Sequence, residues 1–322
     1  MSYNFGVLPP AMAEDEPAGG TLTRRRFLAA SAALALALPR RSPAAEPLEV
    51  AYAGSMTSVM EGAIQGAVAA ALGLDLRGRA QGASALAEEI VGGTVRPDVF
   101  LAITAEPMHI VLGAAKAASA IPFARTEMVI AYAPQGRFAP QFRRVGQPGA
   151  PPWHEILSQP GLRFGRTDPR TDPQGRNIIF VCELAERYYH QPGLAVRLLG
   201  PTFNPRQIFS EALVEGRLQS GQLDAASAYR TQPGPFHVPA VMLPPAINLG
   251  GDLPPAAAGL ALQLNGRTYR PQPLLFYAAA LNAAPHPRAA QRFLAWLQGA
   301  QAQAILGGFG YDPPGEAPPL AA

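Results

Sequence analysis

The chain has 322 residues, of which 48% are hydrophobic and 15% charged, with 35 prolines, 32 glycines and one cysteine. This composition excludes a disordered chain, a collagen-like repeat and a disulfide scaffold, and the length predicts one large domain or two medium ones. The formal net charge of +3 arises mostly in residues 1–45, because the rest of the chain carries 21 basic and 20 acidic residues. A body so close to neutral, with Lys116 as its single lysine, lacks the positive charge that binding a phosphate backbone requires. We therefore expect no nucleic-acid partner.

The first 45 residues have the pattern of an export signal. Arg24 and Arg25 precede an apolar run, Phe27–Leu38, and small residues follow at 42–45. The run has 12 residues, well short of the ~20 that span a bilayer, which favours a cleaved signal over a membrane anchor. The paired arginines resemble the twin-arginine (Tat) signal, with ordinary secretion as the alternative. No cysteine lies near the cleavage site, so we expect no lipid anchor and predict a mature chain free in the periplasm.

From Leu48 onward, short β-rich runs alternate with alanine-rich amphipathic stretches, a pattern typical of an α/β fold with parallel strands. The predicted strands are 48–53, 98–103, 126–133, 162–165, 223–229, 238–242, 258–264 and 273–281. The predicted helices are 57–72, 84–91, 153–158, 175–190, 209–219, 287–298 and 300–306, with glycine, proline or Asp-Pro between most of them.

Two proline-rich stretches, Pro134–Pro152 and Pro233–Pro255, separate these blocks. They are either surface loops or crossovers between two lobes. In the second case, residues 46–131 and 244–322 form lobe 1 and residues 132–243 form lobe 2. Periodicity alone does not choose between the two interpretations.

Motifs for catalysis and for metal binding are not found. Cys182 lies in an apolar, helix-like run, where a buried and inert thiol is the usual outcome. The five histidines stand 36 to 49 residues apart, so no pair has the spacing of a zinc or haem site. The chain also lacks the Gly-x-Ser-x-Gly elbow, the P-loop and the dinucleotide-binding glycine motif. We expect a protein without a cofactor that is not an enzyme.

Two serine motifs mark a candidate binding site. Ser55 follows the first predicted strand in Ala-Gly-Ser-Met-Thr, and Ser84 lies in Gln-Gly-Ala-Ser before a helix. Ligands of open α/β sheets bind at the carboxyl ends of strands, where a helix N-terminus also offers free N–H groups. The alternative is that both serines only cap their helices.

Asp172 is the third candidate. It precedes Pro173 at the start of a predicted helix, as a good N-cap does. A carboxylate repels a fully deprotonated oxyanion unless the anion keeps a proton or expands its coordination through a metal centre. Asp172 is therefore either a cap or an unusual direct ligand.

With these motifs in place, the chain resembles the archaeal-type molybdate/tungstate-binding protein, the periplasmic solute receptor of an ABC transporter, from about Leu48 to Pro313. The resemblance is carried by 53–55, 82–84, 97–99, 123–132, the Asp-Pro region with Gly175, 223–230, 247–250, 284–287, 293–294 and 303–306. It implies a two-lobed type II periplasmic-binding fold with crossovers at 131–134 and 242–245, which closes on a tetrahedral oxyanion. N–H groups and serine hydroxyls would hold the anion.

The family also brings two carboxylates to the metal of the oxyanion. The first matches Asp172, whereas Ala228 stands at the position of the second, directly before Tyr229. This departure leaves four-fold or six-fold coordination open. The predicted ligand-binding residues are Gly54, Ser55, Met56, Ala83, Ser84, Thr171, Asp172 and Tyr229, with Asp172 as the candidate ligand of the oxyanion metal.

The resemblance implies a monomer that captures molybdate or tungstate and serves an ABC transporter permease. Besides a sensor domain without a transporter, two alternatives stay open. One is a receptor for another anion, a carboxylate or a metal chelate. The other is an exported enzyme on the same fold, with Asp172 or Glu127 as base, although no nucleophile and base pair is visible.

Overall fold

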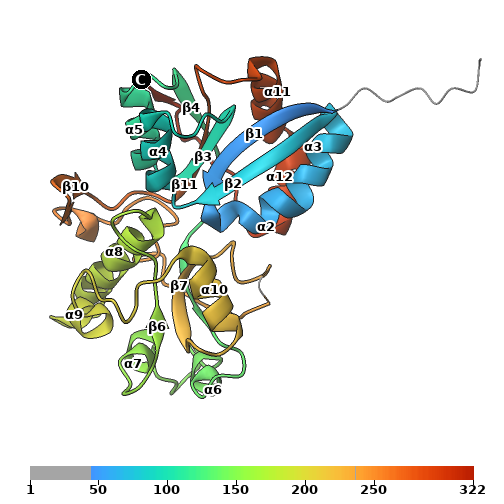
Figure 1. Cartoon of the computed structure of the whole chain (residues 1–322). Helices are drawn as coiled ribbons and strands as arrows, with labels where there is room; N and C mark the ends of the chain where they lie inside the picture. The colour runs from blue at the N-terminus through green and yellow to red at the C-terminus, as the bar shows by residue number, and fades with distance from the viewer. Residues whose placement is uncertain (1–44, 236) are drawn as a thin grey trace, which may run out of the picture. The chain divides into compact units, whose positions relative to one another are not determined.

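Two main β-sheets organise residues 45–235 and 237–322, the part of the chain that the computed structural model describes (Figure 1). The predicted export signal lies outside the described residues, apart from residue 45. No helix in the described ranges is long and apolar enough to cross a membrane.

The first sheet has six strands in the order β12-β4-β11-β3-β1-β2. Its strands are β1 (Glu46–Ala53), β2 (Leu74–Gln81), β3 (Val99–Ile103), β4 (Ser119–Arg125), β11 (Leu275–Ala280) and β12 (Leu320–Ala321). β1 runs parallel to β2 and β3, whereas β11 is antiparallel to β3 and β4. The expectation of parallel strands is therefore wrong for the part of the sheet around β11. This strand comes from the C-terminal part of the chain and runs opposite to its neighbours β3 and β4.

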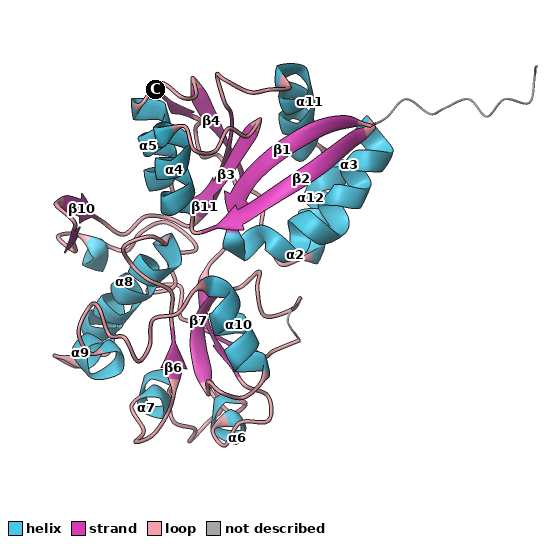
Figure 2. Ribbon diagram, viewed as in Figure 1, coloured by secondary structure: helices cyan, strands magenta, loops and turns pink. Residues whose placement is uncertain are grey.

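Helices from both ends of the described chain pack against the first sheet (Figure 2). The 3-10 turn η1 (Gly54–Met56) and α2 (Thr57–Val59) continue through a π-helical segment, η2 (Met60–Ile64), into α3 (Gln65–Leu72). α4 (Ala83–Gly92) packs against α5 (Ala105–Gly113), and α11 (Pro287–Leu297) packs against α3 and α12 (Ala300–Gly308). α11 buries Ala289, Ala290, Phe293 and Leu297, which share one face at helical spacing.

The second sheet has four strands in the order β6-β7-β5-β8. Its strands are β5 (Met128–Tyr132), β6 (Phe164–Gly165), β7 (Ala225–Tyr229) and β8 (Ala240–Met242). β5 is antiparallel to β7 and β8, and β6 is parallel to β7. The helices in this part of the chain are α6 (Ala139–Phe142), α7 (Trp153–Leu157), α8 (Pro173–Tyr188), α9 (Leu194–Leu199) and α10 (Glu211–Gln219).

The chain passes between the two sheets in the short segment that joins β4 to β5. The Met128 N–H donates to the Asn248 carbonyl at 2.8 Å, and the Thr126 N–H donates to the Leu274 carbonyl at 3.0 Å, so outgoing and returning segments lie side by side. β5 already belongs to the second sheet, and the predicted lobe boundary after residue 131 falls inside it. The passage thus occurs about five residues earlier than the sequence indicates, and the division into two lobes stays a prediction.

The returning chain forms η3 (Pro255–Ala257) and a separate hairpin, β9 (Leu262–Leu264) and β10 (Arg267–Tyr269), before β11. The hairpin brings Tyr269 onto the guanidinium of Arg176. This contact is part of the polar cluster described below.

Candidate functional site

A cleft of about 730 Å³ is lined by segments from both main sheets. Its walls come from 54–57 after β1, 80–85 around the end of β2, 167–172 after β6, and 208–215 at the start of α10. The carboxyl ends of β1 and β2 thus face the second sheet's helices across the cleft (Figure 2). This is the place where open α/β sheets bind ligands.

The turn after β1 supplies the first wall. Gly54 lines the cleft, and Ser55 is 7% exposed with an Oγ that has no hydrogen-bond partner. A Cβ on Gly54 would lie 2.0 Å from Oε2 of Glu211, so glycine is what allows this carboxylate to come so close to the turn.

The segment before α8 supplies the opposite wall. Asp172 has extended backbone angles, and its Oδ1 accepts a hydrogen bond of 2.9 Å from the Gln174 N–H. Asp172 is therefore an N-cap, which is one of the two roles that the sequence left open. A Cβ on Gly175 would lie 2.4 Å from the Thr167 carbonyl oxygen, so α8 is packed directly against this segment.

Thr167 presents a second hydroxyl without a partner. The side chain is 1% exposed and lines the cleft. Its Oγ1 makes no hydrogen bond in the structure, although it lies close enough to the Asp172 carboxylate to lower the pKa of that group. Ser55 and Thr167 thus offer one unused hydroxyl each, from segments that follow β1 and β6.

Glu211 begins α10 and is fixed by buried amides. Its Oε1 accepts a hydrogen bond of 2.9 Å from Gln232 Nε2. Oε1 of Gln232 in turn accepts from the Tyr229 N–H and from Gln174 Nε2, both at 2.7 Å. Because Gln174 and Gln232 are buried, the orientation of the Glu211 carboxylate is set by the second sheet and α8.

Four carboxyl groups line the cleft, namely Asp168, which pairs with Arg170, and Asp172, Glu211 and Glu215. Burial raises the pKa of Asp172 above its usual range, and it raises the pKa of Glu211 further, with added repulsion from Asp172 and Glu215. Burial also raises the pKa of Glu215 to about 7. The cleft therefore disfavours full ionisation of the three groups at neutral pH.

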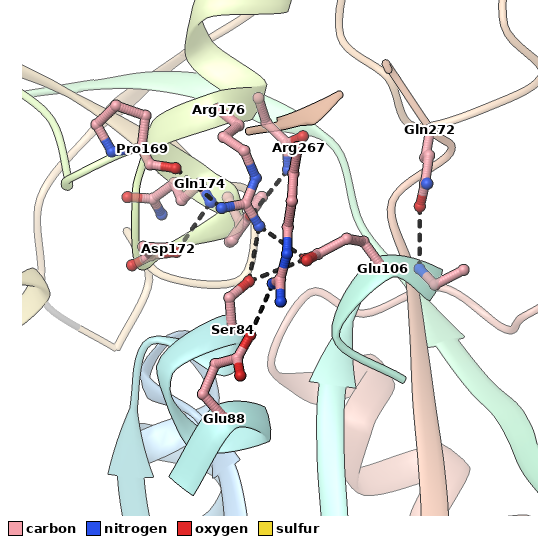
Figure 3. Close-up of polar contacts among 12 residues, drawn as sticks. Ser84, Glu88, Glu106, Pro169, Asp172, Gln174, Arg176, Arg267 and Gln272 are labelled. Carbon is pink, nitrogen blue, oxygen red and sulfur yellow. Dashed lines mark hydrogen bonds and ion pairs between the residues drawn. The ribbon is translucent and has the colours of Figure 1, made fainter. Parts of the chain in front are cut away.

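The Ser84 hydroxyl is already engaged by other side chains (Figure 3). It donates to Oε2 of Glu106 at 2.9 Å and accepts from Nη2 of Arg176 at 2.7 Å. The same Nη2 contacts Oε2 of Glu106 at 2.9 Å, and Nη1 donates to the Pro169 carbonyl at 2.9 Å. Arg176 therefore ties α8 to α4 and α5, with its guanidinium stacked 4.3 Å from the centre of the Tyr269 ring.

The structure brings together part of the predicted ligand-binding set. Gly54, Thr171 and Asp172 line the cleft, and Ser55 is adjacent to it. Met56, Ala83 and Tyr229 are almost fully buried and do not line it. The Tyr229 hydroxyl accepts from Asn177 Nδ2 at 3.0 Å.

Sequence reasoning missed Thr167, Glu211, Glu215, Gln232 and Arg176. A usable signal existed only for the two glutamates, which stand four residues apart at the start of a predicted helix and therefore share a face. Nothing in the sequence connects Arg176 with Glu106, 70 residues away.

Ala228, where the resemblance leads us to expect the family's second carboxylate, lies in β7 opposite Val129 and is 6% exposed. It lines a separate small cavity of about 20 Å³ together with Glu211 and Glu215. Position 228 in β7, which has no carboxylate, thus lies next to the carboxylates of Glu211 and Glu215 from α10.

The thiol and the other candidates lie away from the cleft. Cys182 is 1% exposed, and burial raises its pKa to about 12, as expected of an inert thiol. Glu127 lies at the passage between the sheets, where it pairs with Arg230 and accepts from Asn248. Within 45–235 and 237–322, no group of three or more His, Cys, Asp or Glu side chains is arranged to hold a metal ion.

Comparison with known families shows which family the chain belongs to. Residues 48–312 match the model of the bacterial extracellular solute-binding proteins. The chain belongs to this family. Family membership agrees with the two-sheet architecture and with a cleft between segments of both sheets.

Several relatives are named for solutes. The chain is 30% identical over 195 residues to an uncharacterized solute-binding protein of Petrotoga mobilis, covering 58% of each chain. It is 25% identical over 206 residues to the molybdate/tungstate-binding protein WtpA of Thermococcus kodakarensis, covering 57% of each. The chain thus spans less than two thirds of the length of these curated relatives.

Solved structures show the same fold. The periplasmic molybdate-binding protein of Azotobacter vinelandii aligns with a TM-score of 0.58 at 18% identity, covering 83% of this chain and 99% of the other. The sulfate-binding protein SubI of Mycobacterium tuberculosis aligns with a TM-score of 0.59 at 12% identity, covering 84% and 88%. The predicted periplasmic-binding-protein fold is confirmed.

Proposed function

We propose that this chain is a monomeric periplasmic receptor that captures molybdate or tungstate for the permease of an ABC importer, without catalysis. The names of the relatives support this choice of solute. The observation that carries it is the pair of buried hydroxyls, on Ser55 and Thr167, which lack partners at a cleft built from both sheets. A buried hydroxyl without a partner costs free energy, and a bound tetrahedral oxyanion would remove this cost by accepting a hydrogen bond from each hydroxyl.

In this proposal the turn 54–56 and the Thr167 hydroxyl hold the anion from opposite sides. Asp172 keeps its place as the N-cap of α8 and is not a ligand of the metal. The Ser84 hydroxyl contributes only if Arg176 releases it. The bound anion would then be four-coordinate.

The test is isothermal titration of the chain from residue 46 with tungstate, molybdate, sulfate and phosphate. Ser55→Ala and Thr167→Val should each weaken tungstate binding by roughly ten- to a hundred-fold, as expected for a lost hydrogen bond to a charged group. Thr94→Val, at an exposed site that does not line the cleft, is the matched control. Parent-like binding by both cleft variants would place the site elsewhere.

A receptor for a metal chelate or another cationic solute is the second candidate. It is favoured by three carboxyl groups that line the cleft beside the paired Asp168, namely Asp172, Glu211 and Glu215. Iron-bound HitA of Pseudomonas aeruginosa has the same fold, with a TM-score of 0.52 at 18% identity over 86% of this chain and 89% of the other. Heat of binding with a cationic metal complex such as hexaamminecobalt(III), and none with the four oxyanions, would select this candidate.

For the export route, we propose the Tat pathway. Replacing Arg24 and Arg25 by lysine should leave unprocessed precursor in the cytoplasm, because the Tat receptor recognises the paired guanidinium groups. Fractionation followed by immunoblotting measures this. Normal processing of the double variant would point to ordinary secretion instead.

A further inference from the structure

Arg166 carries a buried positive charge that no ion pair neutralises. Its side chain is 0% exposed, and of the two buried arginines in the described part of the chain only Arg176 has an ion pair. The guanidinium of Arg166 is held by neutral acceptors, namely the carbonyls of Pro201 and Thr202, at 3.2 and 2.8 Å, and Oε1 of Gln207, at 3.2 Å. Its Nη1 has no partner. Because burying an unpaired charge costs stability, a role in binding is the natural place to look for what offsets this cost.

Arg166 lies directly behind the wall of the cleft. Thr167, the next residue, lines the cleft and has an unpartnered hydroxyl. The backbone of Arg166 also pairs with the chain that leads to α10, since its N–H donates to the Gln207 carbonyl at 2.8 Å and its carbonyl accepts from the Phe209 N–H at 3.0 Å. Phe209 lines the cleft as well. Arg166 therefore lies where two wall segments of the cleft meet.

The charge of Arg166 acts on a group that faces the cleft. Although burial opposes it, hydrogen bonds from Arg170 and the charge of Arg166 hold the pKa of the Asp168 carboxyl below its usual range, and Asp168 lines the cleft. Burial lowers the pKa of Arg166 itself, which an arginine tolerates without losing its proton. Protein surrounds this charge, so dissolved ions screen it only weakly. An anion in the cleft would therefore be attracted by it.

We propose that Arg166 sets the charge selectivity of the site, because its buried and unpaired guanidinium favours a doubly charged oxyanion over a singly charged one of the same shape. This inference rests on the proposed function and names the property by which that site selects among tetrahedral anions. Coulomb energy is proportional to the charge of the ligand, whereas the hydroxyls of Ser55 and Thr167 can donate to either anion. Molybdate and tungstate carry two negative charges.

Arg166 acts through its electric field and does not touch the anion, since its side chain does not line the cleft. The carboxyl groups of Asp172, Glu211 and Glu215 belong to the same cleft. A positive charge behind the wall offsets part of their negative charge, whatever contacts they make with the bound anion. A carboxylate paired with Arg166 would cancel this field, which explains why neutral acceptors hold the guanidinium.

The test gives Arg166 a counter-ion and leaves its present hydrogen bonds in place. The Cys182 thiol lies close enough to Arg166 for each group to affect the pKa of the other. Cys182→Asp puts a carboxylate beside the guanidinium, where the free Nη1 can donate to it, and Cys182→Asn is the uncharged control of the same shape. Position 182 does not line the cleft, so neither variant removes a contact with the anion. Isothermal titration uses tungstate and perrhenate, a tetrahedral anion with a single charge.

Cys182→Asn should bind tungstate like the parent. Cys182→Asp should bind tungstate about tenfold more weakly than Cys182→Asn, as expected for a Coulomb interaction lost across the wall of the cleft. Perrhenate should lose only about threefold, the square root of that factor, because its charge is half as large. A distortion of the site would instead weaken both anions by the same factor.

Equal tungstate affinities of the two variants, or equal losses for both anions, overturn the proposal and leave the proposed function intact. The tungstate comparison decides alone where perrhenate binds too weakly to titrate. Thermal unfolding checks that both variants fold. If Cys182→Asp does not, Arg166→Lys and Arg166→Gln decide, since Lys keeps the charge and should bind tungstate about tenfold more tightly than Gln. Equal affinities of that pair overturn the proposal, whereas failure of all four oxyanions to bind the parent overturns the proposed function itself.

Discussion

Arg176→Met should lower the free energy of unfolding by about 2 to 3 kcal/mol, since breaking a buried ion pair leaves its partner uncompensated. The Arg176 side chain is 4% exposed, and it is held by Glu106, Ser84 and the Pro169 carbonyl. Glu106 is 21% exposed, and water reduces the loss below the full value for a buried pair. Urea unfolding measures the change.

A double-mutant cycle separates the ion pair from the packing. Glu106→Gln removes one charge and keeps the shape, and the double variant shows how much of the two losses is shared. A coupling near zero would mean that Arg176 acts through its other contacts, which are Ser84, the Pro169 carbonyl and the Tyr269 ring. If Arg176→Met unfolded like the parent, the bridge between α8 and the helices of the first sheet would contribute nothing.

Much of the fold was predictable, because hydrophobic runs and breakers are local. The predicted strands at 48–53, 98–103 and 273–281 match β1, β3 and β11 closely, and the predicted helix at 287–298 matches α11. β2 was missed because it is an edge strand that buries only Leu74 and Leu76 fully and has Arg, Gly and Gln among its other residues. The direction of β11 was not predictable, since it is set by pairing with strands more than 150 residues away.

The site was only partly predictable for a similar reason. Glycine and serine after a strand, or an Asp-Pro pair, are local signals, and Gly54, Thr171 and Asp172 do line the cleft. The partners of Ser84 and the approach of Glu211 to Gly54 depend on how two sheets face each other. Local patterns therefore locate the segments that line the cleft, but they do not predict which charged side chains, such as Glu211, the fold brings to it.

Ala228→Glu should lower the free energy of unfolding by about 4 kcal/mol or more at neutral pH. Ala228 is 6% exposed and borders a cavity of only about 20 Å³, which also adjoins Glu211 and Glu215. The longer side chain overfills this space, at a cost of about 1 to 3 kcal/mol. The introduced carboxylate would be buried beside two other carboxyl groups without a cation, which adds the cost of an unpaired charge.

Ala228→Gln is the matched control, because it adds nearly the same volume without the charge. The difference between the two variants in urea unfolding therefore isolates the electrostatic part. That difference should shrink as the pH falls, since the folded-state pKa of the introduced carboxyl is raised and its protonation removes the penalty.

A parent-like stability of Ala228→Glu would show instead that this side chain reaches the open cleft. An acidic group at position 228 would then approach the oxyanion beside Asp172, and X-ray absorption of bound tungstate in this variant should show six ligands in place of the four that we propose for the parent.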